Sequence, residues 1–137
     1  MQDIKLLQQI HQSAELGKLH AENALRNTND PALRQALHRQ YRKYQDIYGT
    51  SANYLIARGI PPKSAKLTAR INSHFSIGGC RSASDLASGI IKQENGNLAK
   101  SKKMVQNYKG DDQLVLALAK DLKHAGEQSL EKMQGFL

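Results

Sequence analysis

The sequence predicts an all-α protein, and its composition, apolar spacing and helix-capping signals all indicate that class. Only 5% of the residues are aromatic and none is Trp, so the core must be built from aliphatic and small side chains on helices. Apolar residues recur three and four positions apart in several long segments. The length of 137 residues suits one domain, and we expect residues 1–137 to form a single helical bundle.

The first two predicted helices are separated by a clear stop and start signal. The first spans residues 4–28, and its apolar face contains Leu7, Ile10, Ala14, Gly17, Ala21 and Ala24. The second half of that face is small, so the facing helix must approach closely there. Asp30 as N-cap and Pro31 at the first helical position begin the second helix. It ends near Arg58, because Gly59 is suited to a left-handed C-cap.

A long connection follows the second helix. Leu67, Ile71 and Phe75 predict a shorter helix within residues 62–77. The connection from 59 to 81 is long enough to traverse the bundle, which lets the third long helix run parallel to the second. That crossover is the topology of ferritin-like four-helix bundles.

Capping signals also define the third and fourth long helices. Ser82 followed by Asp85 resembles a capping box that opens the third helix, and Gly110 ends it. Its predicted inner face contains Leu86, Ile90, Glu94, Asn97, Ser101, Met104 and Tyr108. Asp111 or Asp112 caps the fourth helix, whose apolar face reaches the C-terminus.

Five short tracts spread over nearly the whole chain are SAELGK at 13–18, DPALR at 30–34, QYRKY at 40–44, ARGIPPK at 57–63 and LEKMQGFL at 130–137. Together they resemble a family of uncharacterised bacterial ferritin-like proteins. The resemblance implies a ferritin-like four-helix bundle and no particular activity, since the family has none assigned. Relatives tend to carry an acidic residue where this chain has Lys43. A cation inside the bundle would repel a metal ion.

The ligand pattern of ferritin-like di-iron sites is missing from the sequence. Such sites take a Glu from each of two helices and a Glu-x-x-His from each of the other two, and this chain has no Glu-x-x-His. Asp121 and His124 have the right spacing but lie opposite the apolar face of the fourth helix, and His11 with Glu15 is an ordinary surface pair. No ligand-type partner lies at helical spacing from His20, His38 and His74. The sequence therefore predicts no metal and no cofactor.

Glu94 is the acidic residue that the periodicity places on an inner face, with Asn97 one turn later. A buried carboxylate requires a partner. The second helix offers Arg42, Lys43, Tyr44 and Tyr48. We interpret Glu94, Asn97 and Tyr44 as buried polar residues in a structural ion pair or hydrogen bond. A remnant ligand or small-molecule site is the alternative, and general acid–base catalysis would need a second carboxylate in register.

The net charge of +8 is concentrated in the middle of the chain. Residues 31–110 contain 14 Lys and Arg against three acidic residues, a net charge of +11. The candidates for a basic surface are Arg39, Arg42, Lys43, Lys102 and Lys103. Tyrosines interleave with the arginines on the second helix, as in some single-stranded nucleic-acid binders, but their spacing also suits core packing. The cations are divided between helices, so we expect at most weak polyanion binding.

The remaining features limit the function classes. No run approaches 18 apolar residues and the opening segment is amphipathic, so we expect a cytoplasmic protein. Cys80 is the only cysteine, so we expect no internal disulfide and an unreactive thiol. We expect a non-enzymatic structural or interaction protein that forms homo-oligomers. Two alternatives stay open: a nucleic-acid or polyanion binder with a basic surface, and a divergent metal-binding oxidase.

Overall fold

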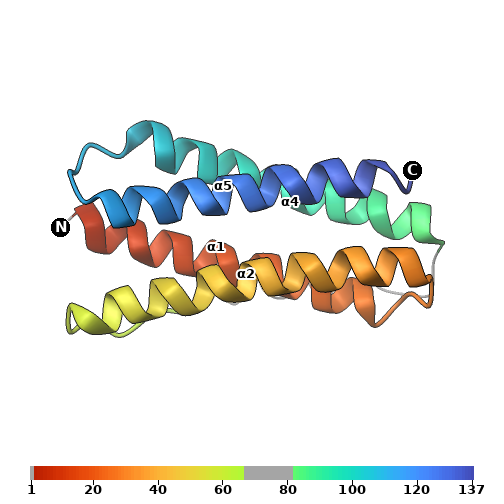
Figure 1. The fold of residues 1–137 in the computed structure, drawn as a ribbon, viewed down its shortest axis with the longest axis horizontal. Helices are drawn as coiled ribbons and strands as arrows, with labels where there is room; N and C mark the ends of the chain where they lie inside the picture. The colour runs from red at the N-terminus through yellow and green to blue at the C-terminus, as the bar shows by residue number, and fades with distance from the viewer. Residues whose placement is uncertain (1, 67–81) are drawn as a thin grey trace.

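The computed structural model describes residues 2–66 and 82–137, and within these ranges the chain forms four long helices (Figure 1). The helices are α1 (Gln2–Leu25), α2 (Pro31–Ala57), α4 (Ala83–Asn107) and α5 (Gln113–Gln134). No strand occurs within these two ranges. Helices of 22 to 27 residues are about 33–40 Å long, so each one extends along most of the bundle.

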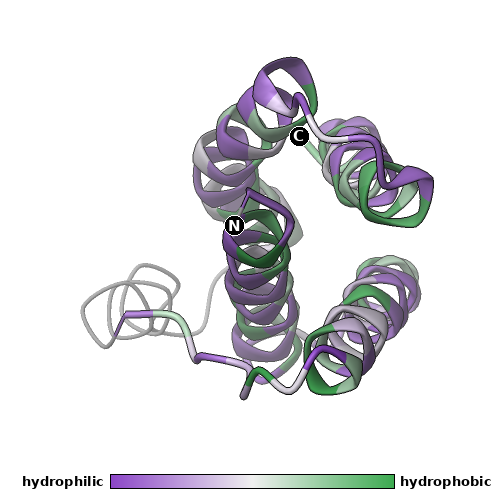
Figure 2. Cartoon of the chain, turned by 90° about the vertical axis from the view of Figure 1, so that its left-hand side faces the viewer, coloured by the Kyte–Doolittle hydropathy of each residue, from purple (hydrophilic) through white to green (hydrophobic). Residues whose placement is uncertain are grey.

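The helices are arranged as two antiparallel hairpins, α1 with α2 and α4 with α5 (Figure 1). α1 also packs against α4, and α2 against α5, so the end-on view shows α2 and α4 at diagonal corners (Figure 2). α2 ends and α4 begins at opposite ends of the bundle, and the two helices run in the same direction (Figure 1). The predicted all-α class and the parallel course of these two helices are confirmed.

The predicted helix starts are also confirmed. The carboxylate of Asp30 accepts a hydrogen bond of 2.9 Å from the backbone N–H of Leu33, and the Ser82 hydroxyl accepts one of 3.1 Å from Asp85. Of the two candidates for α5, Asp112 is the N-cap, with its Oδ1 accepting from the first turn of that helix. Side-chain acceptors at these positions satisfy N–H groups that a helix cannot pair internally.

Two helices end earlier than the sequence predicts. α1 ends at Leu25 rather than at residue 28. α4 ends at Asn107 because Tyr108 leaves the helix with φ −70° and ψ 122°, and its hydroxyl donates a 2.7 Å hydrogen bond to Asp3 at the start of α1. After α2, Gly59 adopts a φ of +73°, the left-handed conformation predicted for it.

The prediction of a helix beginning at Pro62 is wrong for the described part of that segment, because residues 60–66 are not helical. Their backbone is instead held along α1 by three side chains. Gln8 accepts from the N–H of Lys63 at 2.9 Å and donates to the carbonyl of Pro61 at 3.0 Å. Gln12 donates to the carbonyl of Ser64, and Glu15 accepts from the N–H of Ala65. The rest of the predicted helix, with Leu67, Ile71 and Phe75, lies outside the described residues.

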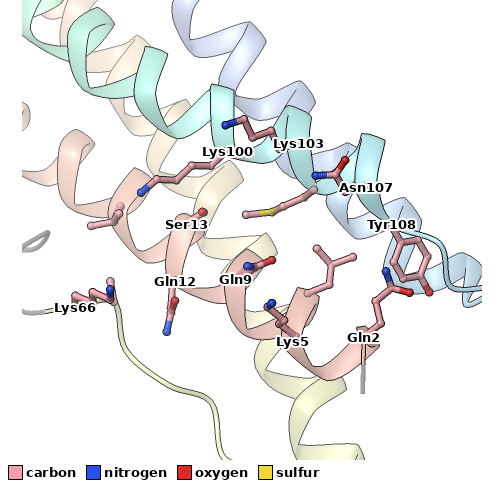
Figure 3. Close-up of a pocket in the computed structure, with 14 residues that line it drawn as sticks. Gln2, Lys5, Gln9, Gln12, Ser13, Lys66, Lys100, Lys103, Asn107 and Tyr108 are labelled. Atoms are coloured by element: carbon pink, nitrogen blue, oxygen red, sulfur yellow. The ribbon is translucent and has the colours of Figure 1, made fainter.

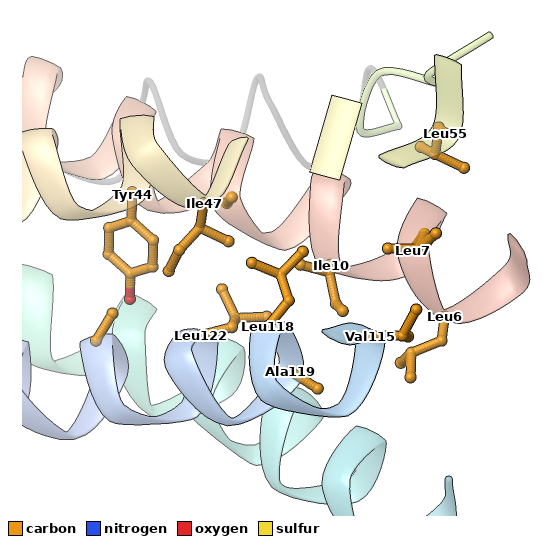
Figure 4. Packing of buried hydrophobic residues seen from close by; sticks show 12 residues of the cluster. Leu6, Leu7, Ile10, Tyr44, Ile47, Leu55, Val115, Leu118, Ala119 and Leu122 are labelled. Carbon is orange, nitrogen blue, oxygen red and sulfur yellow. The ribbon is translucent and has the colours of Figure 1, made fainter. Parts of the chain in front are cut away.

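Among the described residues the core contains two apolar clusters. The larger one lies where α1, α2 and α5 meet (Figure 4) and contains Leu6, Leu7, Ile10, Ala14, Tyr44, Ile47, Leu55, Val115, Leu118, Ala119, Leu122 and Ala125. The smaller one lies toward the other end of the bundle and contains Ala24, Leu33, Ala36, Leu37, Leu86, Ala87, Ile90 and Met133. All six residues of the predicted apolar face of α1 are buried. The close approach expected along that face occurs at Gly17, where a Cβ atom would lie 2.6 Å from the ring of Tyr44.

Candidate functional site

The main candidate for a functional centre is a polar network around Glu94 in the middle of the bundle. The Glu94 side chain is fully buried. Its Oε1 accepts a hydrogen bond of 2.9 Å from the Nε2 of Gln40, and its Oε2 accepts one of 3.3 Å from the hydroxyl of Tyr44. Both donors belong to α2 and are neutral, so α4 and α2 are joined across the diagonal of the bundle by this carboxylate.

The network extends to the other two helices. Gln40 accepts a 2.7 Å hydrogen bond on its Oε1 from the hydroxyl of Ser129 on α5. On α1, the Nδ1 of His20 lies 3.8 Å from the Oε2 of Glu94, within ion-pair distance when the imidazole is protonated. The exposed fractions of Gln40, Ser129 and His20 are 7%, 5% and 4%. Each of the four helices therefore contributes a buried polar side chain to one network.

Tyr44 is a hydrogen-bond donor in this network. Burial raises the pKa of its hydroxyl well above the usual value of 10.0, and the neighbouring Glu94 raises it further through its charge and its hydrogen bond. The phenol therefore keeps its proton at any physiological pH. A neutral phenol next to a carboxyl group can donate to it but supplies no anionic ligand.

A second buried polar group lies between α1 and α2. The Nδ1 of His11 lies 2.9 Å from the hydroxyl of Ser51 and 3.2 Å from the carbonyl of Tyr48. The Ser51 hydroxyl donates to the same carbonyl, so a proton on the Nδ1 of His11 satisfies both contacts. The imidazole also stacks on the ring of Tyr48, with 4.2 Å between the ring centroids. Burial lowers the pKa of His11 below its usual value, which favours the neutral ring.

The predicted buried polar residues lie as follows. Glu94 and Tyr44 contact each other, and Asn97, one turn further along α4, donates from its Nδ2 to the carbonyl of Ser13 at 3.1 Å. The placement of Lys43 inside the bundle is wrong, because its side chain is exposed. Arg42 is exposed as well, so neither cation pairs with Glu94.

Several buried polar residues are not predicted from the sequence. His11 is expected on the surface and His20 without a ligand-type partner, yet both are buried. Gln40 was not singled out. A signal was available, because Gln40 lies three residues after Leu37 and four before Tyr44, and so shares their face of α2.

The basic-surface candidates do not form one surface. Arg39, Arg42 and Lys43 are exposed on α2, while Lys102 and Lys103 are exposed on α4. These helices occupy diagonal corners of the bundle (Figure 2). Of these five residues, Lys103 alone is among the described residues that line a groove between α1 and α4 (Figure 3).

Within residues 2–66 and 82–137, no group of three or more His, Cys, Asp or Glu side chains is arranged to hold a metal ion. Asp121 and His124 are exposed, on the outer side of α5 as the periodicity predicts. Cys80 and His74 lie outside the described residues.

Comparisons with known proteins identify the fold. No family model matches the chain, and no curated protein matches it. Among solved structures, the chain is similar to Dps from Microbacterium arborescens, determined in its high-iron form, with a TM-score of 0.80. The match covers 98% of this chain and 91% of that chain. The fold is a ferritin-like four-helix bundle. The sequence identity is 14%, so the likeness concerns the fold alone.

Although each described helix exceeds 18 residues, none carries the apolar stretch that a membrane crossing requires.

Proposed function

We propose that this chain is a non-enzymatic structural or interaction protein of the uncharacterised bacterial ferritin-like family that its motifs resemble. The observation that carries the proposal is that both oxygens of Glu94 accept hydrogen bonds from neutral side chains of the same chain. The centre of the bundle thus contains a polar network that satisfies its own buried carboxyl group.

The residues around Glu94 do not fit a di-metal centre. Such a centre in a ferritin-like bundle takes carboxylates from all four helices and two histidines. Around Glu94 the described residues supply one carboxyl group, one imidazole, an amide and a phenol that keeps its proton. A metal ion bound to Glu94 would displace the hydrogen bonds from Gln40 and Tyr44 and leave both donors buried without an acceptor, which is costly.

The metal content of untagged protein tests this proposal. Cells are grown with added iron and manganese, and the purified protein is analysed for both elements next to a Glu94→Gln variant. We expect no stoichiometric metal in either protein. About two metal ions per chain in the wild type, lost in Glu94→Gln, would contradict the proposal and favour a divergent metal-binding oxidase.

Self-association is part of the same proposal. Two large apolar side chains are exposed at one end of the bundle, Ile56 near the end of α2 and Leu114 near the start of α5, with exposed fractions of 60% and 64%. An ion pair of 2.8 Å between Arg58 and Asp112 joins the two helices there. Removing these apolar groups from water would favour association. Sedimentation velocity should show that the wild type is an oligomer and that the double variant Ile56→Lys with Leu114→Lys is a monomer. A monomeric wild type would contradict the proposed self-association.

A further inference from the structure

A groove of about 920 Å³ lies between α1 and α4 and is closed at one side by the end of the 60–66 segment (Figure 3). Its described lining residues include four lysines and no Asp or Glu. The lysines are Lys5 on α1, Lys66 at the end of the 60–66 segment, and Lys100 and Lys103 on α4. Within the described residues none of the four forms an ion pair. The groove therefore concentrates positive charge that no ion pair among the described residues neutralises.

The acidic residues of α1 near this groove are held by other contacts. Asp3 accepts the hydrogen bond from the hydroxyl of Tyr108, and Glu15 accepts from the backbone N–H of Ala65. Their carboxylates are thus engaged with groups other than the lysines. A ligand that enters the groove would meet ammonium groups on both of its walls, from Lys5 and Lys66 on one side and from Lys100 and Lys103 on the other (Figure 3).

Side-chain amides make up most of the remaining polar lining, with Gln2, Gln9 and Gln12 from α1 and Asn107 from α4. An amide both donates and accepts hydrogen bonds, as a peptide backbone requires, whereas a phosphate only accepts. The adjacent side of α1 already binds a non-helical backbone in this way, through Gln8 and Gln12 on residues 61–64. The groove repeats the same amide chemistry beside four cations.

The apolar lining and the dimensions favour a peptide as well. Leu16 and Met104, which are partly exposed, supply contact surface for aliphatic side chains. The lining residues of α1 extend from Gln2 to Leu16, about 21 Å of helix, which matches about six residues of extended peptide. Among the described lining residues the one aromatic is Tyr108, so this part of the groove offers no repeated aromatic surface of the kind on which single-stranded nucleic acids stack.

We infer that the α1–α4 groove binds an acidic segment of a partner protein in extended conformation. The amides of Gln2, Gln9 and Asn107 pair with the segment's backbone, and the ammonium groups of Lys5, Lys100 and Lys103 pair with its carboxylates. This inference rests on the proposed role as an interaction protein and specifies the kind of partner. It does not depend on the metal content of the bundle, so the metal analysis and the binding experiment below can fail separately.

The probe is a fluorescein-labelled peptide of alternating Glu and Ala, about six to ten residues long, followed by anisotropy at about 50 mM salt, where surface charge is weakly screened. The groove variant is Lys100→Glu with Lys103→Glu. The matched control is Lys92→Glu with Lys102→Glu, which changes the same residue types on the same helix by the same net charge at exposed positions outside the groove. Circular dichroism and thermal unfolding of both variants establish that the bundle is intact.

We expect wild type and control to bind the peptide with affinities within about threefold and the groove variant to bind at least about tenfold more weakly. A peptide of the same charge with N-methylated alanines should bind more weakly than the parent, because half of its backbone donors are removed. Equal weakening in both variants, or no binding by the wild type, would overturn the inference. An oligothymidylate of equal charge that binds as tightly as the peptide, and loses binding in the groove variant, would overturn it in favour of nucleic acid.

Discussion

Replacing Gly17 with Ala tests the closest helix–helix approach in the bundle. A Cβ atom at this position would lie 2.6 Å from three ring atoms of Tyr44, whereas ordinary contacts begin near 3.4 Å. The ring would have to move by about 0.8 Å, and it has little freedom to do so. It is 1% exposed, and its hydroxyl is held by Glu94 at 3.3 Å.

Two opposing effects decide the size of the change. Overpacking of a well-packed core destabilises by about 1–3 kcal/mol, while replacing a helical glycine with alanine stabilises by about 0.5–1 kcal/mol. We therefore expect Gly17→Ala to lower the free energy of unfolding by about 0.5–2 kcal/mol. Gly96 is the matched control, since it lies on the exposed side of α4 and a Cβ there meets nothing within 4 Å. Gly96→Ala should be stabilising by about 0.5–1 kcal/mol.

Urea unfolding and thermal unfolding of both variants measure the difference. Both variants gain helix propensity. The difference of about 1–3 kcal/mol between their changes in the free energy of unfolding therefore measures the steric clash with Tyr44. In a domain of this size each kcal/mol moves the Tm by about 3–5 °C. Equal Tm shifts for Gly17→Ala and Gly96→Ala would refute the close packing of α1 against Tyr44.

Three further variants probe the capping and polar contacts. Asp112→Ala should cost about 1–2 kcal/mol of stability in urea unfolding because α5 loses its N-cap, whereas the exposed neighbour Asp111 should tolerate Ala within about 0.5 kcal/mol. Glu94→Ala should cost about 3–5 kcal/mol, since it leaves a cavity and two buried donors without an acceptor, and a Tm close to that of the wild type would contradict the network. Burial lowers the pKa of His11, so the unfolded chain binds more protons than the folded chain below about pH 6.5 and stability falls as the pH drops through that range. His11→Gln should reduce the slope of the free energy of unfolding against pH between about pH 7.5 and 5. An unchanged slope would argue against the link between His11 protonation and stability.

The four helices could be predicted from the sequence because local chemistry sets them. Capping by Asp30 and Ser82, and the spacing of apolar residues, depend on contacts within one helix or one turn. The 60–66 segment could not be predicted in the same way. Its backbone is held by Gln8, Gln12 and Glu15, which lie about 50 positions away in the chain.

The candidate site was predictable in part for the same reason. Glu94 stands out because a carboxylate interrupts an apolar face, a signal that one helix contains by itself. Its contacts with Gln40 and His20 depend on how three helices pack, and such polar residues look like surface residues in sequence. The α1–α4 groove likewise combines Lys5 with Lys100 and Lys103, which only the bundle brings together.

The most direct test of the central claim, that the chain's own donors satisfy the buried carboxyl group, is thermal unfolding with added metal. Wild type and Glu94→Gln are heated in parallel with and without about 100 μM Fe(II) under anaerobic conditions. A site with a Kd of about 1 μM would stabilise the wild type by about 2.7 kcal/mol and raise its Tm by about 10 °C. We predict that Fe(II) changes the Tm of wild type and of Glu94→Gln equally, by less than about 1 °C. A large rise in the wild type that is absent in Glu94→Gln would contradict the account.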